Sequence, residues 1–219
     1  MEEKISNRPC LDMNKAIEMV KAYAQLKGYD GNELVEILKK AFIGWFSRSV
    51  ASAVFVFCKN RNGEWCVLAS ERGEEAADFQ GFWNCPCGYL DFDETTTNAA
   101  RRECYEETGV NLDINKIEFM SFEDDPITAN RQNVTFRFAC VIDDKTIDEF
   151  LFSKRNNEGK EVGRIMWIPV DTIDNYAWAF NHKERIHEAF DKYVDPDHSY
   201  RNRMKRKKSW RKFWNDFWY

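Results

Sequence analysis

The pattern of apolar and polar positions divides the chain into a helical N-terminal part and a strand-rich body. Apolar residues recur at helical spacing over residues 12–27 and again over 31–47. Gly28 and the Asp30-Gly31 pair separate the two segments and are typical of a helix end followed by a new helix start. The first 47 residues are therefore predicted to form a helical hairpin.

The body begins with a strong hairpin signal. Residues 50–72, VASAVFVFCKNRNGEWCVLASER, hold two β-rich runs on either side of an Asn-Gly turn. The remaining elements are strands at 117–123, 133–142 and 162–169, and helices at 95–108 and roughly 180–193. Gly109 directly follows the first of these helices and is a good C-cap residue. Strands mixed with a few helices predict an α/β domain whose sheet is covered on both faces.

Length and composition fit one main domain with extensions. The chain has 219 residues, of which 43% are hydrophobic, enough to fill a sizeable core. We expect an N-terminal helical extension at 1–47, the main domain at 48–195 and a separate tail at 196–219. No apolar run approaches the roughly 20 residues that span a membrane, and the N-terminus lacks the order of a secretory signal. A cytoplasmic protein without a transmembrane segment is therefore predicted.

The number and placement of the cysteines also fit a cytoplasmic protein. The seven cysteines are odd in number and several fall in predicted strands and helix, which suits reduced thiols better than a disulfide framework. Cys85 and Cys87 form a close pair. No second pair or histidine group stands at zinc-site spacing, so the two are expected to be loop and core residues.

Charge is distributed unevenly along the chain. The net charge is −5, yet residues 201–219, RNRMKRKKSWRKFWNDFWY, carry eight Lys/Arg against the single acid Asp216. The aromatic residues of this tail follow helical spacing, so it could dock on the body or on a partner subunit, including in a homodimer. Binding to nucleic acid or to an anionic membrane surface are the alternatives.

Three glutamates crowd one side of the predicted helix at 95–108. At 100° per residue, Glu103, Glu106 and Glu107 project from the same side, where like charges repel. A solvated helix face is the ordinary explanation. A rigid group of carboxylates also suits Mg²⁺ or Mn²⁺, hard cations that prefer oxygen ligands and bridge to phosphate. Such a cation polarises a phosphoryl oxygen and activates water, which predicts hydrolysis of a phosphoanhydride.

Two further residues support this site. Arg102 stands at i,i+4 from Glu106 and beside Glu103, so it can orient a carboxylate and carry phosphate charge. Glu94 lies eight residues before Arg102 and is expected to pair or cap rather than bind metal.

These residues carry a family resemblance. Gly88, five residues, Glu94, seven residues and then RECYEETGV at 102–110 resembles the Nudix box, Gly-x5-Glu-x7-Arg-Glu-U-x-Glu-Glu-x-Gly-U, where U is aliphatic. Every charged and glycine position of the pattern is present. Cys104 stands where Ile, Leu or Val is usual, and a buried thiol is a tolerable small apolar substitute.

The resemblance implies an α/β/α sandwich with a mixed sheet and cation-dependent hydrolysis of a nucleoside diphosphate linked to another moiety. It implies that Glu103, Glu106 and Glu107 hold Mg²⁺ or Mn²⁺ and that Arg102 orients them. In many members a glycine before the box lends its backbone carbonyl to the metal. Cys87 occupies that position here and is expected to supply the carbonyl, although its Cβ puts the metal geometry in question.

Residues outside the box are harder to assign. Glu161 is a candidate general base in a loop before the strand at 162–169, and Glu103 could serve instead through a metal-bound water. Arg72 stands where a basic residue near substrate is common in the family, and an exposed surface arginine is the alternative. Trp83, like Phe82, Trp178 and Phe180, could stack on a substrate base, whereas aromatic residues at such spacing are more often core.

Two other functions stay open. A Nudix-like module could sense a nucleotide without cleaving it, with the basic tail on nucleic acid. An isomerase acting on isopentenyl diphosphate would need a reactive cysteine, for which Cys85 and Cys87 are the nominal candidates. The complete box favours the hydrolase, and the sequence assigns no particular substrate.

Overall fold

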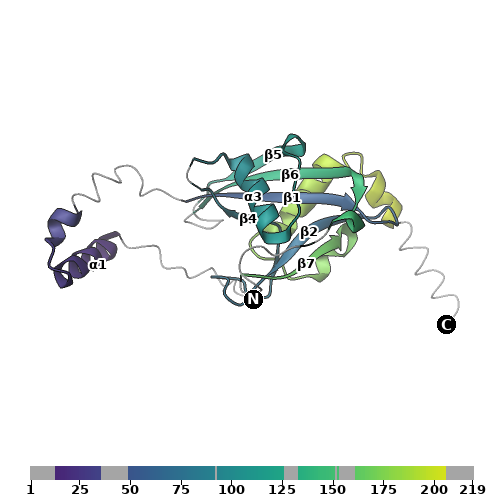
Figure 1. Cartoon of the computed structure of the whole chain (residues 1–219). Coiled ribbons are helices and arrows are strands. Elements are labelled where there is room, and N and C mark those ends of the chain that lie inside the picture. The colour runs from purple at the N-terminus through teal and green to yellow at the C-terminus, as the bar shows by residue number, and fades with distance from the viewer. Residues whose placement is uncertain are drawn as a thin grey trace. The chain divides into compact units, whose positions relative to one another are not determined.

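The computed structural model describes residues 13–35, 49–91, 93–125, 133–150, 152 and 161–205. The chain forms two compact units. One comprises Met1–Ser49 with Asp124–Val134, and the other comprises Val50–Glu123 with Thr135–Tyr219. The second unit holds the sheet and both helices that pack on it (Figure 1).

The N-terminal unit contains helix α1, Met13–Leu26. The chain leaves this helix through Gly28, whose φ of 80° is the left-handed conformation that favours glycine. Asp30 then caps a second helical segment, because its Oδ1 accepts the backbone N–H groups of Asn32 at 2.8 Å and Glu33 at 3.2 Å. This segment is helical from 31 to 35. The predicted first helix and the start of the second are confirmed, and the rest of 31–47 lies outside the described residues.

A seven-stranded sheet forms the centre of the second unit, with the order β3-β2-β1-β6-β5, β4 on β1 and β7 on β2. Its strands are β1 (Ser49–Lys59), β2 (Trp65–Arg72), β3 (Trp83–Asn84), β4 (Cys87–Tyr89), β5 (Ile117–Glu123), β6 (Asn133–Thr146) and β7 (Val162–Pro169). The predicted hairpin is confirmed: β1 and β2 pair antiparallel from Phe57 opposite Val67, and Gly63 turns the chain with a φ of 72°.

Both faces of the sheet are covered. On β1, Phe55 and Phe57 pack in a core cluster with Ile186 of α4 (His182–Ala189). Val54 and Val56 point to the opposite face and join Cys104 of α3 (Thr96–Thr108) in the second cluster. Because alternate residues of a strand point to opposite faces, one continuous apolar strand serves both layers. This is the α/β/α sandwich that the sequence predicts.

Short helical turns complete the domain: η1 (Ile114–Lys116), η2 (Ile147–Glu149), η3 (Val170–Asn175) and the π-helical η4 (Phe190–Val194), which continues α4. Strand β6 runs four residues past the predicted end at residue 142. None of the helices in the described parts of the chain is long and apolar enough to cross a membrane.

The start of the predicted tail packs on this domain. Residues 199–205 are helical, and buried Asp195 caps them by accepting the N–H groups of Tyr200 at 2.8 Å and Arg201 at 3.0 Å. Tyr200 is buried, and its hydroxyl accepts the Trp65 N–H at 3.1 Å. The tail therefore docks on the body up to residue 205. Its aromatic residues from 210 onward lie outside the described residues, and the division at 1–47, 48–195 and 196–219 stays a prediction.

Candidate active site

Helix α3 holds the predicted carboxylates on a well-fixed element. Thr95 caps its start by accepting the Asn98 N–H at 3.2 Å, and Gly109 ends it in the left-handed conformation with a φ of 81°. The helix buries Cys104 completely against the sheet, so the thiol occupies the apolar position as expected. The opposite side of the helix is left to the charged residues.

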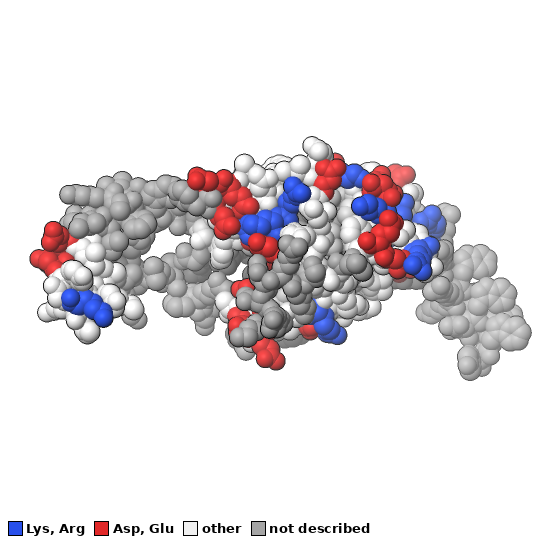
Figure 2. Space-filling model, viewed as in Figure 1, with Lys and Arg blue, Asp and Glu red and all other residues white. Residues whose placement is uncertain are grey.

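Arg102 lies at the centre of the charged group. Its Nη1 donates to Glu103 at 2.7 Å and to Glu106 at 3.0 Å, and its Nη2 donates to Glu94 at 3.0 Å and to the Tyr89 carbonyl at 2.8 Å. Glu94 thus pairs with the arginine, as the spacing predicts. These contacts raise the pKa of Arg102, with the hydrogen bond that it donates to Glu94 as the largest cause. Figure 2 shows basic and acidic side chains lying side by side in the region of α3.

Glu103 lies over a glycine. A Cβ at Gly88 would overlap the carboxylate of Glu103, so only glycine admits the side chain in this position. Gly88 is fixed in turn by β4, where it pairs with Ser52 of β1. The Glu103 side chain is 15% exposed, and burial raises its pKa. The first glycine of the box therefore makes room for the first glutamate of the helix.

Glu107 is the most enclosed of the three glutamates. Its Oε2 accepts the Ser70 hydroxyl at 3.2 Å, and its Oε1 accepts the Cys87 backbone N–H at 3.4 Å. Burial, followed by the charge of Glu103, raises its pKa to about 8. A carboxyl with this pKa is largely protonated near neutral pH, and a nearby cation would favour its charged form.

The donor set fits a hard divalent cation. Glu103, Glu106 and Glu107 present carboxylate oxygens. Burial is the largest cause of the raised pKa of Glu103 and of Glu107, and a cation beside them would favour the charged form of both. In the described part of the chain, no three acidic, thiol or imidazole groups already converge on one point. One reason is that Arg102 Nη1 holds an oxygen of both Glu103 and Glu106. Metal binding therefore requires these carboxylates to turn.

The thiols near the site are not reactive groups. Burial raises the pKa of Cys87 to about 12 and that of Cys85 well above its usual value, so both are neutral thiols at physiological pH. The Asn84 amide donates to Cys87 Sγ at 3.6 Å. A mechanism that needs a thiolate, as in the isomerase alternative, has no support from either residue.

Arg72 was predicted either to lie near substrate or to be an exposed surface residue, and the structure does not have it exposed on the surface. Its side chain is 17% exposed, and its Nη2 pairs with Asp78 Oδ1 at 2.7 Å. The Arg72 charge lowers the pKa of Glu107, so the guanidinium lies within electrostatic range of the glutamates. Contact with substrate stays a prediction for this residue.

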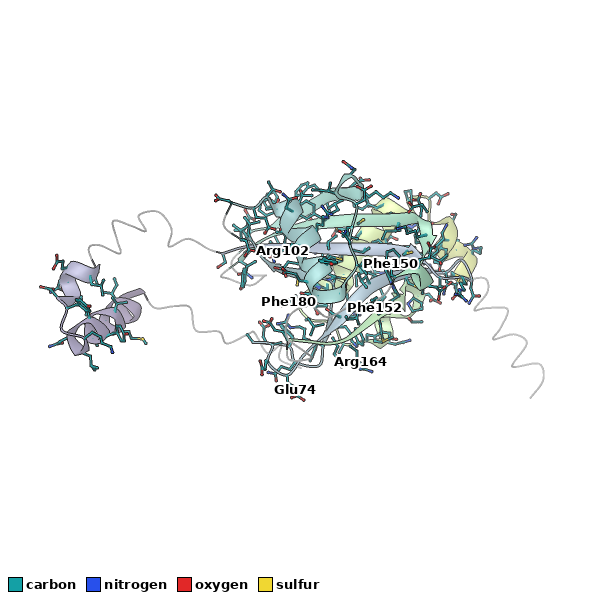
Figure 3. The ribbon with its side chains drawn as sticks, viewed as in Figure 1. Glu74, Arg102, Phe150, Phe152, Arg164 and Phe180 are labelled. Atoms are coloured by element: carbon teal, nitrogen blue, oxygen red, sulfur yellow. The ribbon has the colours of Figure 1, made fainter. Side chains whose placement is uncertain are left out.

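An aromatic group borders Arg72. The guanidinium carbon lies 5.2 Å from the centre of the Phe180 ring, which packs edge-on against Phe79 at 5.0 Å. Both phenylalanines have positive φ, 55° and 52°, which is rare for bulky residues and is associated with functional sites. Figure 3 shows Arg102 and Phe180 at the same end of the domain.

Two other predicted residues lie elsewhere. Trp83 is 5% exposed, packs edge-on against Tyr176 and belongs to the core on the α4 face, so its ring offers almost no surface to a base. The core position is the alternative that the sequence analysis gave for this ring, and its contact with substrate stays a prediction. Glu161 is exposed directly before β7, where its carbonyl accepts the Gly73 N–H at 2.7 Å. Its part as a general base stays a prediction.

Two polar residues of the site, Ser70 and Asn84, escaped the sequence analysis. The Ser70 hydroxyl lies 3.2 Å from both Glu107 Oε2 and Asn84 Oδ1, and its single proton can be donated to one of them at a time. His182 Nδ1 accepts the Cys85 N–H at 3.0 Å, and burial followed by the charges of Arg137 and Arg72 lowers its pKa to about 3. The sequence held one sign of such a residue, because Ser70 is polar and stands at the end of an apolar strand run.

Comparison with known proteins agrees with this geometry. The sequence matches the NUDIX domain family over residues 50–190. The chain belongs to the Nudix family. Over 49 residues it is 47% identical to the phosphatase NudJ of Escherichia coli, a match that covers 20% of this chain and 32% of that protein. The chain thus spans about a third of the length of the curated relatives that it matches.

Solved structures share the fold at low sequence identity. A MutT/nudix family protein from Enterococcus faecalis is 21% identical with a TM-score of 0.55, covering 74% of this chain and 70% of that one. The NUDIX domain of Shewanella oneidensis NrtR, solved with ADP ribose, is 18% identical with a TM-score of 0.57, covering 71% and 99%. A bifunctional NMN adenylyltransferase/ADP ribose pyrophosphatase from Francisella tularensis, solved with AMP and a manganese ion, is 20% identical with a TM-score of 0.53, covering 82% and 52%. These likenesses show the Nudix fold.

Proposed function

We propose that the chain is a Nudix hydrolase that uses Mg²⁺ or Mn²⁺ to cleave the pyrophosphate bond of a nucleoside diphosphate linked to another moiety. One observation carries the proposal. On α3, Glu103 and Glu106 both accept hydrogen bonds from Arg102 Nη1, and Glu103 is packed over Gly88. One arginine cannot neutralise several carboxylates, so the group keeps a surplus of negative charge that a bound cation would offset.

The residues of the site have different roles in this proposal. Glu103, Glu106 and Glu107, with the backbone carbonyl of Cys87, would hold the cation. When bound, the cation would polarise a phosphoryl oxygen and supply an activated water. Arg102 orients Glu103 and Glu106 through Nη1, while Ser70 and the Cys87 N–H orient Glu107. Glu103 and Glu161 are the candidates for the general base.

The surroundings suit a nucleotide. Arg72 supplies positive charge near Glu107, and the partly exposed ring of Phe180 lies beside it. An aromatic ring with an arginine on it is a common support for a base. The Shewanella NUDIX domain was solved with ADP ribose and the Francisella enzyme is an ADP ribose pyrophosphatase, so ADP-ribose belongs in the first group of compounds to test.

The test is metal-dependent turnover with coupled phosphate detection against nucleoside diphosphate derivatives, comparing the wild type with Glu106→Gln. We expect cleavage of one or two compounds and a loss of about 10² or more in the variant. Glu118→Gln, on an exposed position of β5, is the matched control and should keep full activity. Equal activity of the wild type and Glu106→Gln would contradict the proposed metal site.

A second candidate is a nucleotide-sensing module. Shewanella NrtR was solved with a 27mer DNA, and this chain carries its own basic segment at 201–219. Under this alternative the same panel would give tight binding of one compound without turnover. Binding to DNA that depends on the basic segment would then support the module.

A further inference from the structure

Arg72 and Phe82 lie on the sheet face that carries α3, next to the carboxylates. Ser70 and Arg72 are alternate residues of β2, so their side chains point to the same face, and the Ser70 hydroxyl lies 3.2 Å from Glu107. On the neighbouring strand, Asn84 pairs with Ser70, and the Phe82 carbonyl accepts the Arg72 N–H at 2.8 Å. Alternation along this strand puts the Phe82 side chain on the face of Asn84. Arg72 and Phe82 therefore stand two residues, about 7 Å, along the strands from the pair that contacts Glu107.

Three phenylalanine rings and the Arg72 guanidinium form one connected group. The Phe79 ring lies 5.7 Å from the Phe82 ring and 5.0 Å from the Phe180 ring, measured between ring centres. The guanidinium carbon of Arg72 lies 5.2 Å from the centre of the Phe180 ring. The loop after β2 fixes this guanidinium, because Nε donates to the Asp78 carbonyl at 2.8 Å and Nη2 donates to Asp78 Oδ1 at 2.7 Å. The group thus joins that loop, the residue before β3 and the segment before α4.

Two of the rings belong to residues with an unusual backbone. The φ angle is 52° at Phe79 and 55° at Phe180. Positive φ is rare for bulky residues, persists only where surrounding contacts fix it, and is associated with functional sites. The Phe79 carbonyl accepts the Phe82 N–H at 3.0 Å, and the Ala179 N–H donates to the Trp83 carbonyl at 2.8 Å. The chain therefore holds the two strained residues in place with their rings in contact.

Two of the rings are also open to solvent, unlike the ring of Trp83. Phe82 is 38% and Phe180 is 39% exposed, whereas Trp83 points to the opposite face and belongs to the core. The contacts of Phe79 with Phe82 and Phe180 are edge-on, with angles of 68° and 62° between the ring planes. Neither contact is a parallel stack. A flat ligand can therefore still stack on either exposed ring.

The chemistry and the position of the group suit a nucleobase. Every base has a π-face that stacks on an aromatic side chain, and an arginine adds cation–π attraction. A ribose separates a base from its first phosphate, and two residues of β2 separate Arg72 from the Ser70 contact with Glu107. Phe180 also lies at the same end of the domain as Arg102 (Figure 3). A nucleoside whose phosphate meets the carboxylates of α3 would therefore have its base beside these rings.

We propose that Phe82 and Phe180 bind the base of the substrate by stacking, with Arg72 as the cationic contact of the same subsite. The identity of the ligand as substrate rests on the proposed function, whereas the stacking site does not. The two rings contact the nucleoside and not the second moiety. The enzyme then selects its substrates by the nucleoside and tolerates variation in the group attached to the diphosphate.

The first experiment measures the stacking site without metal. The wild type is titrated by calorimetry in EDTA with the 5′-monophosphates of adenosine, guanosine, cytidine and uridine, and with ribose 5-phosphate, which lacks a base. We expect at least one nucleotide to bind roughly tenfold or more tighter than ribose 5-phosphate, and Phe82→Ala and Phe180→Ala to lose most of this preference. Phe122→Ala, which removes a 55% exposed ring from β5, is the matched control and should change the preference by less than about twofold.

Two further variants separate stacking from simple apolar contact. Phe180→Trp should keep the preference, because stacking needs a flat ring, whereas Phe180→Leu should lose it although the residue stays apolar. Thermal unfolding shows that each variant is folded, and truncation of a partly exposed ring should leave the melting temperature close to that of the wild type. Equal affinity of the folded wild type for the nucleotides and ribose 5-phosphate, or no binding of either, would overturn the proposal. So would a preference that survives in both alanine variants.

The second experiment tests whether the same rings select the substrate. One pair of nucleoside diphosphate derivatives differs only in the base, and another pair shares the base and differs only in the second moiety. The wild type should discriminate the first pair by about tenfold or more in kcat/KM and the second by less than about threefold. Phe180→Ala should lose the first discrimination mainly through KM, because stacking is the same in the ground state and the transition state. Discrimination of the second pair alone would overturn the assignment of the base to these rings.

The hydrolase proposal and the base subsite fail in different ways. Glu106→Gln should lose turnover yet keep the preference for a nucleotide over ribose 5-phosphate in EDTA. A wild type that shows this preference without turning over any compound would support the subsite and contradict the hydrolase. Turnover without the preference would support the hydrolase and overturn the subsite.

Discussion

The carboxylate of Glu103 occupies the space where Gly88 would carry a Cβ. The two residues are 15 positions apart in the chain, and the pairing of β4 with β1 brings the glycine under α3. The first glycine of the Nudix box thus has a steric reason in this protein. Its backbone angle does not require glycine, since Gly88 is not among the positive-φ residues of the described chain.

Gly88→Ala should therefore impair catalysis more than folding. The added Cβ displaces the Glu103 carboxylate, and misplacement by about 1 Å can cost roughly 10² in rate. We expect kcat/KM to fall by about 10- to 100-fold, while the melting temperature stays close to that of the wild type. In the Glu103→Ala background the same change should have little further effect, because the clashing group is gone. Additive losses in the double variant would contradict this explanation.

Arg102→Lys should destabilise the apo protein. The guanidinium contacts Glu94, Glu103, Glu106 and the Tyr89 carbonyl at once, which a single ammonium cannot do. We expect the free energy of unfolding in urea to fall by about 1–3 kcal/mol. Arg101→Lys is the matched control on the same helix: the Arg101 guanidinium donates to the exposed Asn111 side chain, and its replacement should change this free energy by less than about 0.5 kcal/mol. Equal losses would show that the network adds no stability.

The raised pKa of Glu107 predicts a pH dependence. Its folded pKa of about 8 exceeds the value of 4.5 expected in the unfolded chain, so the folded state binds the extra proton between these limits. The free energy of unfolding should fall as pH rises from about 4.5 to about 8 and then level off. Glu107→Gln should flatten this slope. Urea unfolding at fixed ionic strength and without divalent cations measures it, and an unchanged slope in the variant would assign the effect to another group.

The same proton should compete with the cation. If Glu107 binds metal as a carboxylate, Mn²⁺ affinity should rise with pH up to about 8, by at most tenfold per unit for one proton, and binding should release that proton. Calorimetry in two buffers of different ionisation enthalpy counts the protons released. A pH-independent affinity would exclude Glu107 as a ligand that titrates on binding.

Cys87→Ser should keep cation affinity and turnover within about threefold. The pKa of Cys87 is raised to about 12, so the thiol is neutral, and its proposed contribution to the metal site is the backbone carbonyl. The control is Cys140→Ser, in which the same exchange occurs in the buried core of β6 and away from the proposed ligands. A loss of about 10² or more in Cys87→Ser alone would instead make the thiol part of the chemistry.

Local spacing was enough to predict the helical half of the site. The period of an α-helix places Glu103, Glu106 and Glu107 together and puts Arg102 one turn from Glu106, and the structure has the Arg102–Glu106 contact at 3.0 Å. Gly109 ends the helix as predicted. Alternation and turn residues likewise predicted the β1–β2 hairpin. These features depend on residues only a few positions apart, and backbone geometry fixes their relation.

The tertiary structure decided which side chains from distant segments meet. Trp83 is as aromatic as Phe180, yet β3 places it in the core while the other ring lies beside Arg72. Asp78 forms an ion pair with the guanidinium of Arg72. Ser121 lies opposite Arg137 only because of the register between β5 and β6. A shift of one residue in that register would turn the two side chains to opposite faces. The sequence by itself determined the family and the carboxylates of α3, whereas strand pairing determined their steric and electrostatic surroundings, because these arise from contacts between residues far apart in the chain.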